Sequence, residues 1–267
     1  MMLFRNIAIV IYRAYLAIGM KLWKHQRREP SVAHEILNEY TQLNSSLKTE
    51  LEIKEAIRHL KSLKAFHHPD RPKNWDTCKG LVFILTHSDS SSAVLDVGCG
   101  SYGGVVLPSL SLYGYNRLCG VDLALRRDFS RGPIKYLRRD LTRTELPAES
   151  FNFIVSMSVI EHGVSLREYF TEMSRLLQPG GYLITSTDYW IDAINTQGLV
   201  PSLKCLGEVR IFNKDTIQEG VSIAEDVGFS LLEPIDYNCT DRVAYWKEVD
   251  CEFTYLQFIM QKSREHL

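Results

Sequence analysis

The sequence predicts an α/β fold in which a mostly parallel sheet carries helices on both faces. From residue 93 onward, short β-branched apolar runs alternate with helical segments, and several of these runs end at glycine or acidic positions. Hydrophobic residues make up 45% and charged residues 24% of the chain, which argues against disorder, a collagen-like repeat and a polytopic membrane protein. Such alternation places ligands at the carboxyl ends of the parallel strands.

The first strand, helix and second strand form one unit. The run AVLDV predicts a strand over 93–97, and the string GCGSYG follows it directly. Glycine permits positive φ and lets a ligand approach the main chain, so this string predicts a ligand-binding turn. The apolar segment 105–113 predicts the helix, in which Pro108 is tolerated only in the first turn. The next strand is predicted over 117–121 and ends at Asp122.

The later elements follow from start and stop signals. Ser165 and Glu168 have the spacing of a capping box, and the helix that they begin ends before Pro179-Gly180-Gly181. Asn213 caps a second helix, which Gly228 ends. The segment between Asp122 and Ile134 is short and basic, so we expect a truncated helix there. The remaining strands are predicted over 134–139, 151–157, 182–187, 229–234 and 253–260.

The chain before residue 89 has a different pattern. Residues 30–88 predict a helical extension with solvated, amphipathic helices, and residues 89–267 predict the α/β domain. Residues 1–29 predict a separate apolar and basic helix. The six Lys and Arg residues and one Glu of residues 1–30 give this segment a net charge of +5, whereas the whole chain has −1.

The first helix has two interpretations. Residues 3–20 are strongly apolar, but Arg13 leaves runs too short to cross a bilayer core of about 30 Å. No small-residue cleavage site follows, so a signal peptide is disfavoured. Residues 1–28 can lie on an anionic membrane surface, or the helix can pack on the body of the protein or on a second subunit. The sequence does not distinguish between membrane contact and packing on protein, and it does not predict the oligomeric state.

Asp96 distinguishes between two kinds of nucleotide ligand. In a dinucleotide site the pyrophosphate lies over the glycine turn, where a neighbouring carboxylate would repel it in a partly desolvated groove. A ligand with an adenosine half and a cationic amino-acid half is instead attracted by a carboxylate at this place. Asp96 therefore favours S-adenosylmethionine, although a strand-end Asp can also serve only to accept bonds from turn amides.

Five segments in this order resemble the class I S-adenosylmethionine-dependent methyltransferase family: VLDVGCGSYG, GVDL, RRDL, SFNFIVSMSVIEH and LLQPGGYLITS. The resemblance covers about residues 93–187, with a weaker similarity over 209–229. It implies a Rossmann-like, doubly wound sheet of about seven strands, of which the last is antiparallel. One departure is Asn152, because the family more often has Phe-Asp at the start of the fourth strand.

The resemblance also implies the cofactor site. It implies that Asp122 holds the ribose hydroxyls of S-adenosylmethionine and that Asp140 with Leu141 flanks the adenine. The methionine end is shaped by Asp96, Gly98, Gly100 and Gly103. We predict as further cofactor contacts Cys99, Leu123 and Ser158.

The chemistry of such a cofactor requires few side chains. The sulfonium-bound methyl group is already a good electrophile, so the protein must mainly hold a nucleophile in line and exclude water. If the acceptor is a hydroxyl, a general base contributes about 10²–10⁴-fold. The candidates at strand ends are His162 and Asp188, and the alternative for His162 is a structural or cofactor-packing role.

The acceptor is predicted only by class. The near balance of 31 basic and 32 acidic residues gives no footprint for nucleic acid. The six scattered cysteines and the lack of ligand spacing predict neither a metal site nor a disulfide framework, so we expect reduced thiols in the cytoplasm. We expect transfer to a small-molecule, glycan or lipid-linked acceptor, preferably at oxygen. The alternatives are a non-catalytic nucleoside-binding relative and an NAD-dependent oxidoreductase.

Overall fold

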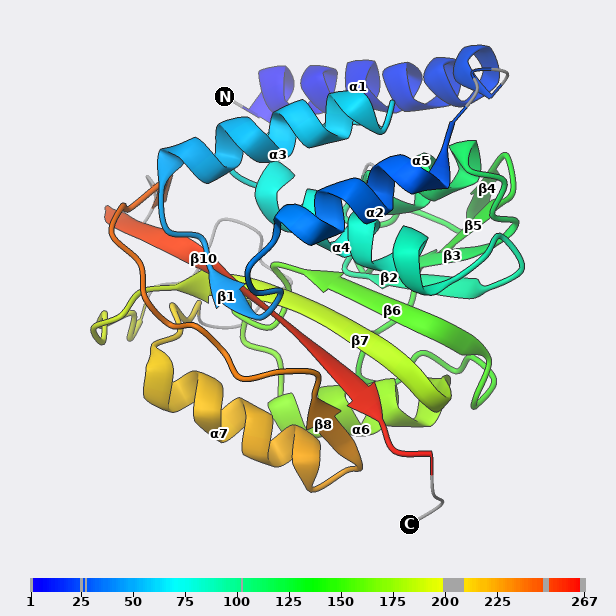
Figure 1. The fold of residues 1–267 in the computed structure, drawn as a ribbon. Coiled ribbons are helices and arrows are strands. Elements are labelled where there is room, and N and C mark those ends of the chain that lie inside the picture. Colours follow the sequence, from blue (N-terminus) through cyan, green and yellow to red (C-terminus); the bar gives the residue numbers. More distant parts are fainter. Residues whose placement is uncertain are drawn as a thin grey trace.

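The computed structural model describes residues 2–24, 26, 28–101, 103–198, 209–246 and 250–264, with no account of the side chains of residues 2–8. Within these residues there are ten strands: β1 Ser45–Ser46, β2 Ala93–Val97, β3 Arg117–Val121, β4 Phe129–Arg131, β5 Ile134–Leu137, β6 Phe151–Met157, β7 Leu177–Tyr189, β8 Phe229–Leu231, β9 Ala244–Trp246 and β10 Cys251–Lys262. They form one twisted sheet in the order β1-β10-β7-β6-β2-β3-β5-β4, to which β8 and β9 add by pairing with β10 (Figure 1).

The central strands have the predicted arrangement. β2 is parallel to β3 and to β6, β3 is parallel to β5, and β6 is parallel to β7, whereas β10 is antiparallel to β7. The α/β, doubly wound fold with an antiparallel last long strand is therefore confirmed. Because the parallel strands share a direction, their carboxyl ends lie at one edge of the sheet.

The strand count exceeds the expected seven through three short strands, β1, β4 and β9. The expectation of a helix between Asp122 and Ile134 is wrong, because β4 runs antiparallel to β5 there. Only Gly132 and Pro133 separate these two strands, and Gly132 has φ +57°. A connection this short turns the chain back on itself as a hairpin and leaves no room for a helix.

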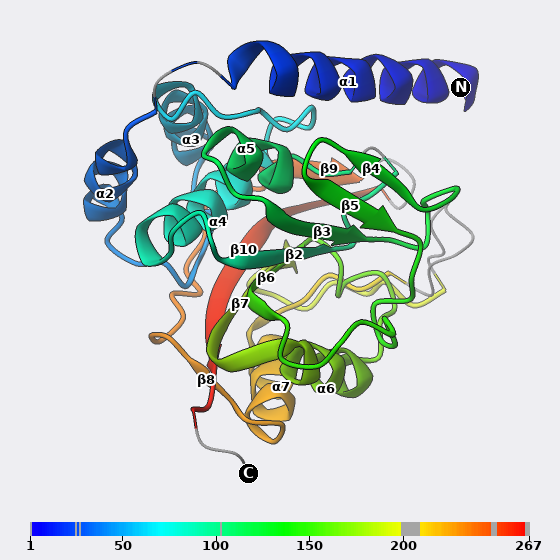
Figure 2. The same cartoon turned by 90° about the vertical axis from the view of Figure 1, so that its right-hand side faces the viewer.

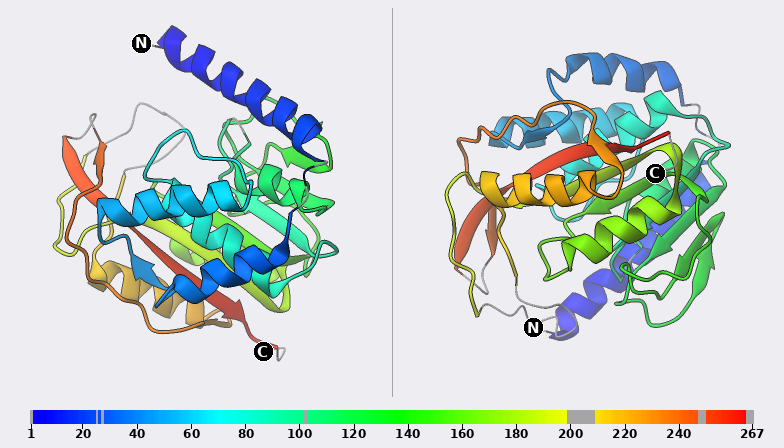
Figure 3. Two further views of the ribbon diagram at one scale, coloured as in Figure 1. Left: turned by 45° about the horizontal axis from the view of Figure 1, so that its top comes forward. Right: turned by 90° about the horizontal axis from the view of Figure 1, so that it is seen from below.

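Helices cover both faces of the sheet (Figures 1 and 3). One face carries α6 Leu166–Leu176 and α7 Lys214–Glu225, and the other carries α1 Met2–Trp23, α2 Pro30–Glu39, α3 Glu50–Ser62, α4 Asn74–His87 and α5 Val106–Leu112. Pro108 is the third residue of α5, within its first turn, as the sequence requires. Asn213 caps α7 through the bond that Thr216 N–H donates.

The predicted capping box at the start of α6 does not form. Ser165 makes no side-chain cap bond, and instead its backbone carbonyl accepts the Tyr169 N–H at 2.9 Å. The apolar face of α6 fixes the helix without the cap, because Tyr169, Phe170 and Met173 are wholly buried against the sheet.

The segment before residue 89 contributes to the sheet and to its covering layer. Ser45 and Ser46 of β1 pair with Gln257 and Leu256 of β10. Most of α4 is buried, and Gly80 permits its close contact with β6, because a Cβ there would lie 2.5 Å from Cε of Met157. This contact brings the first turn of α4 toward the carboxyl ends of the parallel strands (Figure 2).

α1 packs on the body through one face only. Leu16 and Met20 are buried, Trp23 stacks on Phe66 with ring centroids 5.1 Å apart, and the Tyr12 hydroxyl donates to the carbonyl of His67. The packing interpretation of this helix therefore holds for this face. In the part of the chain that the structure describes, no helix is long and apolar enough to span a bilayer.

Candidate cofactor and acceptor site

The glycine turn after β2 has the conformation that its residues permit. Gly98 has φ +72°, and its N–H donates to the carbonyl of Val121 at 2.8 Å. A Cβ on Gly98 would lie 2.4 Å from Cγ2 of Val159, and one on Gly104 would lie 2.6 Å from Oδ2 of Asp96. Glycine is therefore required at both places by backbone conformation and by space.

A cavity of about 400 Å³ opens beside this turn. It lies where β2, β6 and β7 end and where the first turn of α4 and the strands β9 and β10 approach them. Of the predicted site residues it brings together six, namely Asp96, Gly98, Cys99, Ser158, His162 and Asp188. Both candidate bases thus face the same space as the glycine turn.

The other predicted residues lie outside this cavity, at the neighbouring strand ends. Asp122 accepts the N–H groups of Gly100 at 2.7 Å and Ala124 at 2.6 Å, so it fixes the turn. Leu123 is 41% exposed. Asp140 is exposed and accepts from Thr142, and Leu141 packs against the core on the α6 side. The φ of Gly103 is +88°, and its carbonyl accepts the buried Tyr136 hydroxyl. These positions neither confirm nor contradict a ribose and adenine role, which stays a prediction.

Sequence reasoning missed several cavity residues. The structure adds Lys73, Asp76, Glu161, Trp246, Phe253 and Tyr255. Lys73 and Asp76 come from the start of α4, in the segment expected to be a solvated extension, and no motif in the sequence links them to the site. Phe253 and Tyr255 alternate along the last strand, which is the one signal that predicts a shared face for these two rings.

Lys73 is the one lysine of the cavity among the described residues. Its amine donates to the Ser158 hydroxyl, lies 3.7 Å from Oδ1 of Asp188 and lies 3.8 Å from the centroid of the Tyr255 ring. Ser158 has φ +54°, a strained conformation for a residue with a side chain, and such strain clusters at functional sites.

Four carboxyl groups, of Asp76, Asp96, Glu161 and Asp188, are buried around this cavity. Burial raises the pKa of each of them. The pKa of Asp96 reaches about 8, because burial is reinforced by the neighbouring Asp122. The pKa of Asp188 also reaches about 8, through burial and the charge of Glu161. The cavity therefore has a surplus of acidic groups over cations.

Two polar atoms in the cavity wall lack a hydrogen-bond partner among the described residues. They are Oε1 of Glu161, whose other oxygen accepts from Thr187 at 3.2 Å, and Nδ1 of His162. Burial lowers the pKa of His162, and Lys73 adds to this, against the opposite effect of Asp188 and Asp122. His162 is consequently neutral at pH 7 and able to accept a proton.

Comparison with known proteins finds a match to the part of the chain that contains the glycine turn. The family model of a methyltransferase domain matches residues 95–185, from the middle of β2 into β7. Residues 95–185 thus form a methyltransferase domain of the kind found in the class I S-adenosylmethionine-dependent family. The family named from the sequence is thus confirmed, and the NAD-dependent alternative is set aside.

The methyltransferase relatives are distant. Sterol 24-C-methyltransferase erg-4 of Neurospora crassa is 27% identical over 61% of this chain and 46% of its own length. Ubiquinone biosynthesis O-methyltransferase of Chromobacterium violaceum is 34% identical over 40% of this chain and 49% of its own. The chain thus spans about half the length of these curated relatives. Among solved structures, the [4+2]-cyclase SpnF shares the fold with a TM-score of 0.51 and 14% identity, over 80% of this chain and 94% of its own.

The methyltransferase site fits S-adenosylmethionine, the cofactor of the family. Where these acidic groups are ionised, their surplus suits a ligand with a sulfonium and an ammonium group and would repel a pyrophosphate. The glycines leave the backbone open beside Asp96, and the free oxygen of Glu161 lacks a donor that a ligand can supply. Asp96, Gly98 and Ser158 are the residues that we expect to hold the cofactor's amino-acid end.

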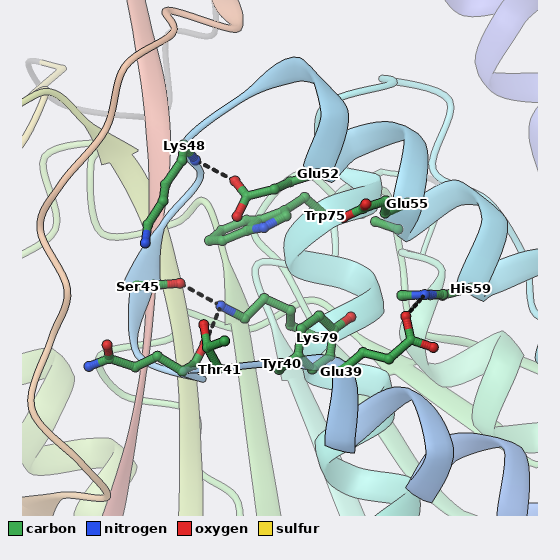
Figure 4. A pocket seen from close by; sticks show the side chains of 12 residues that line it. Glu39, Tyr40, Thr41, Ser45, Lys48, Glu52, Glu55, His59, Trp75 and Lys79 are labelled. Carbon is green, nitrogen blue, oxygen red and sulfur yellow. Dashed lines mark hydrogen bonds and ion pairs between the residues drawn. The ribbon is translucent and has the colours of Figure 1, made fainter.

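The methyltransferase chain also has a second cavity, of about 220 Å³, between α2, α3, α4 and β1 (Figure 4). Lys79 lies at its base, 2% exposed, and its amine donates to the Ser45 hydroxyl at 2.7 Å. The amine lies 4.5 Å from the Trp75 ring, and among the described residues it has no carboxylate within ion-pair distance. Burial lowers the pKa of Lys79 to about 7, against the opposing charges of Glu52 and Glu233.

Lys79→Met is expected to stabilise the protein, and more so at pH 6 than at pH 9. The folded-state pKa is about 7 and the unfolded value is about 10.4, so the unfolded chain binds more protons between these values, and wild-type stability rises with pH there. Methionine removes this dependence. Thermal melts at both pH values, with the exposed Lys61→Met as the matched control, should show a Tm gain at least about 4 °C larger at pH 6. Equal gains at the two pH values would contradict the assignment.

Proposed function

We propose that this chain transfers the methyl group of S-adenosylmethionine to a small-molecule, glycan or lipid-linked acceptor, at a hydroxyl oxygen, by in-line displacement. The observation that carries the proposal is that the glycine turn, His162 and Asp188 all line the same cavity. A cofactor held at the turn and a nucleophile held beside these two groups would share about 400 Å³ of space.

The residues of the cavity supply what the reaction needs. When bound, S-adenosylmethionine supplies a methyl group on a positively charged sulfur, which is electrophilic without further activation. Trp246, Phe253 and Tyr255 also line the cavity, and their rings would help to exclude water from it when the ligands are bound. Neutral His162 accepts the proton of the acceptor hydroxyl.

The preference for oxygen rests on this candidate base. Some of the relatives are named for methyl transfer to carbon and others for methyl transfer to oxygen, so the comparisons leave the target atom open. A hydroxyl needs to lose a proton as it is methylated, and the unpartnered Nδ1 of His162 supports this residue as the group that accepts it. Carbon transfer is the alternative outcome, and the product distinguishes the two.

The acceptor can be found by profiling. Metabolite, glycan and lipid extracts are incubated with the protein and with S-adenosylmethionine that carries a labelled methyl group. The labelled product is then identified by mass spectrometry, and its O–CH₃ or C–CH₃ bond by NMR. We expect a labelled methyl ether or ester. Saturable S-adenosylhomocysteine binding with no labelled product in any extract would instead support a non-catalytic relative.

Asp96→Asn is expected to weaken S-adenosylhomocysteine binding about tenfold at pH 9 and little at pH 6. With a pKa near 8, Asp96 is already neutral at pH 6 in the free protein, where the amide closely mimics it. At pH 9 the wild-type carboxylate attracts the cofactor's ammonium group, and the loss of about 1.4 kcal/mol corresponds to a factor of ten. Calorimetric titrations at both pH values measure this, with the exposed Asp89→Asn as control. An effect of the same size at both pH values would argue against a charged Asp96.

A further inference from the structure

The outer face of α1 is apolar and uncovered. Among the described side chains of this helix, five large apolar ones are at least 37% exposed, namely Val10, Ile11, Tyr15, Ile18 and Leu22. At about 100° per residue they fall within about 140° of the helix circumference, on the side opposite the buried Leu16 and Met20. Contiguous apolar surface of this kind marks an interaction site rather than ordinary solvent-exposed surface.

The charged Lys, Arg, Asp and Glu side chains of residues 1–28 are of one sign. Residues 1–28 contain six Lys and Arg and no Asp or Glu. Lys21 and Lys24 are exposed at the end of α1, and Arg126, also exposed, lies close enough to Arg13 to help lower the pKa of Arg13. An apolar stripe with a cationic border is complementary to a surface that has negative headgroups above an apolar layer.

α1 also touches the cofactor turn. The guanidinium of Arg13 donates to the backbone carbonyl of Ser101, within the GCGSYG string, and a Cβ on Gly132 would lie 3.0 Å from Cε of Met20. The amino-terminal half of α1 extends toward the side of the molecule at which β2 and β3 end (Figure 2). A surface bound to the outer face of α1 would thus lie near the methyl-transfer site.

We infer that the outer face of α1 docks on an anionic membrane, with its five exposed apolar side chains in the headgroup region and its cations on the lipid phosphates. For a lipid-linked acceptor this docking delivers the substrate at the bilayer surface, a consequence that rests on the proposed function. The docking itself does not, because it needs only the helix and its charges.

Vesicle flotation of the full chain tests this inference. Liposomes of phosphatidylcholine with 30% phosphatidylglycerol are compared with pure phosphatidylcholine, and wild type with Ile11→Asp/Ile18→Asp. The matched control is Leu51→Asp, because Leu51 is 60% exposed in the first turn of α3, where an acidic residue is favourable. Wild type and Leu51→Asp should float with the anionic vesicles, and the double variant should float at least tenfold less. Neutral vesicles and 0.5 M salt should each reduce wild-type flotation several-fold.

Two outcomes would overturn the inference. One is equal flotation of wild type and the double variant. The other is the absence of wild-type flotation. If wild type is then a dimer by light scattering and the double variant is a monomer, a second copy of the chain occupies the outer face of α1 instead. S-adenosylhomocysteine binding by every variant shows that each is folded. Flotation needs no methyl acceptor. The membrane inference can therefore fail while the proposed methyl transfer holds, and the proposed methyl transfer can fail while the membrane inference holds.

Discussion

Gly98→Ala is expected to weaken S-adenosylhomocysteine binding by more than 100-fold and to abolish methyl transfer. The added Cβ would lie 2.4 Å from Cγ2 of Val159, a distance at which one of the two segments has to move. Val159 follows Ser158 and is 5% exposed, so the displacement spreads to both walls of the cavity. The backbone bond from Gly98 N–H to the carbonyl of Val121 is lost or lengthened at the same time.

Gly114→Ala is the matched control for this change. Gly114 also has a positive φ, +89°, so alanine costs similar backbone strain, of about 1–2 kcal/mol. A Cβ added to Gly114 would have Cβ of Ser90 as its nearest neighbour, at 3.8 Å, which is an ordinary contact distance. We expect Gly114→Ala to lower Tm by a few degrees and to bind the cofactor product normally in calorimetry. Comparable binding losses in the two variants would mean that strain, rather than the closeness of Gly98 to the cavity, causes the effect.

The order of strands and turns along the chain is enough to predict which residues lie together at the carboxyl ends of the parallel strands. Strands β2, β3 and β6 are parallel neighbours, so residues that follow each of them, such as Gly98 and Ser158, meet at one edge whatever the helices do. The same logic placed Asp188 at the end of β7. The fold class and the group of residues that meet at this edge are therefore predictable from local patterns.

Lys73 and Asp76 could not be predicted in this way. Their place in the cavity depends on the contact between Gly80 and Met157, which sets where α4 lies on the sheet. Neither hydrophobic periodicity nor any motif contains that information. Sequence alone also gave no indication of the Lys73 contact with Asp188, although this lysine is the main counter-charge of an otherwise acidic cavity.

His162→Gln is expected to lower turnover about 10²–10³-fold while S-adenosylhomocysteine affinity changes less than threefold. The reason is the proton that a hydroxyl acceptor must lose, which glutamine cannot take at neutral pH. Because burial keeps the pKa of His162 below its ordinary 6.5, wild-type turnover should rise with pH only below about 6.5 and be level through neutrality. Labelled-methyl incorporation between pH 5 and 8 measures both effects, and the acidic limb should be missing in the variant.

His162→Phe separates a base from a packing role. The imidazole meets the Trp246 ring edge-on with centroids 6.2 Å apart, and phenylalanine preserves this contact while it removes both ring nitrogens. If His162 is the base, phenylalanine and glutamine reduce turnover alike, and both variants bind the cofactor product. If the ring serves only to support Trp246, phenylalanine retains wild-type turnover and its acidic limb. In that event Asp188, which faces the same cavity, becomes the remaining candidate, and Asp188→Asn should then cause the larger loss.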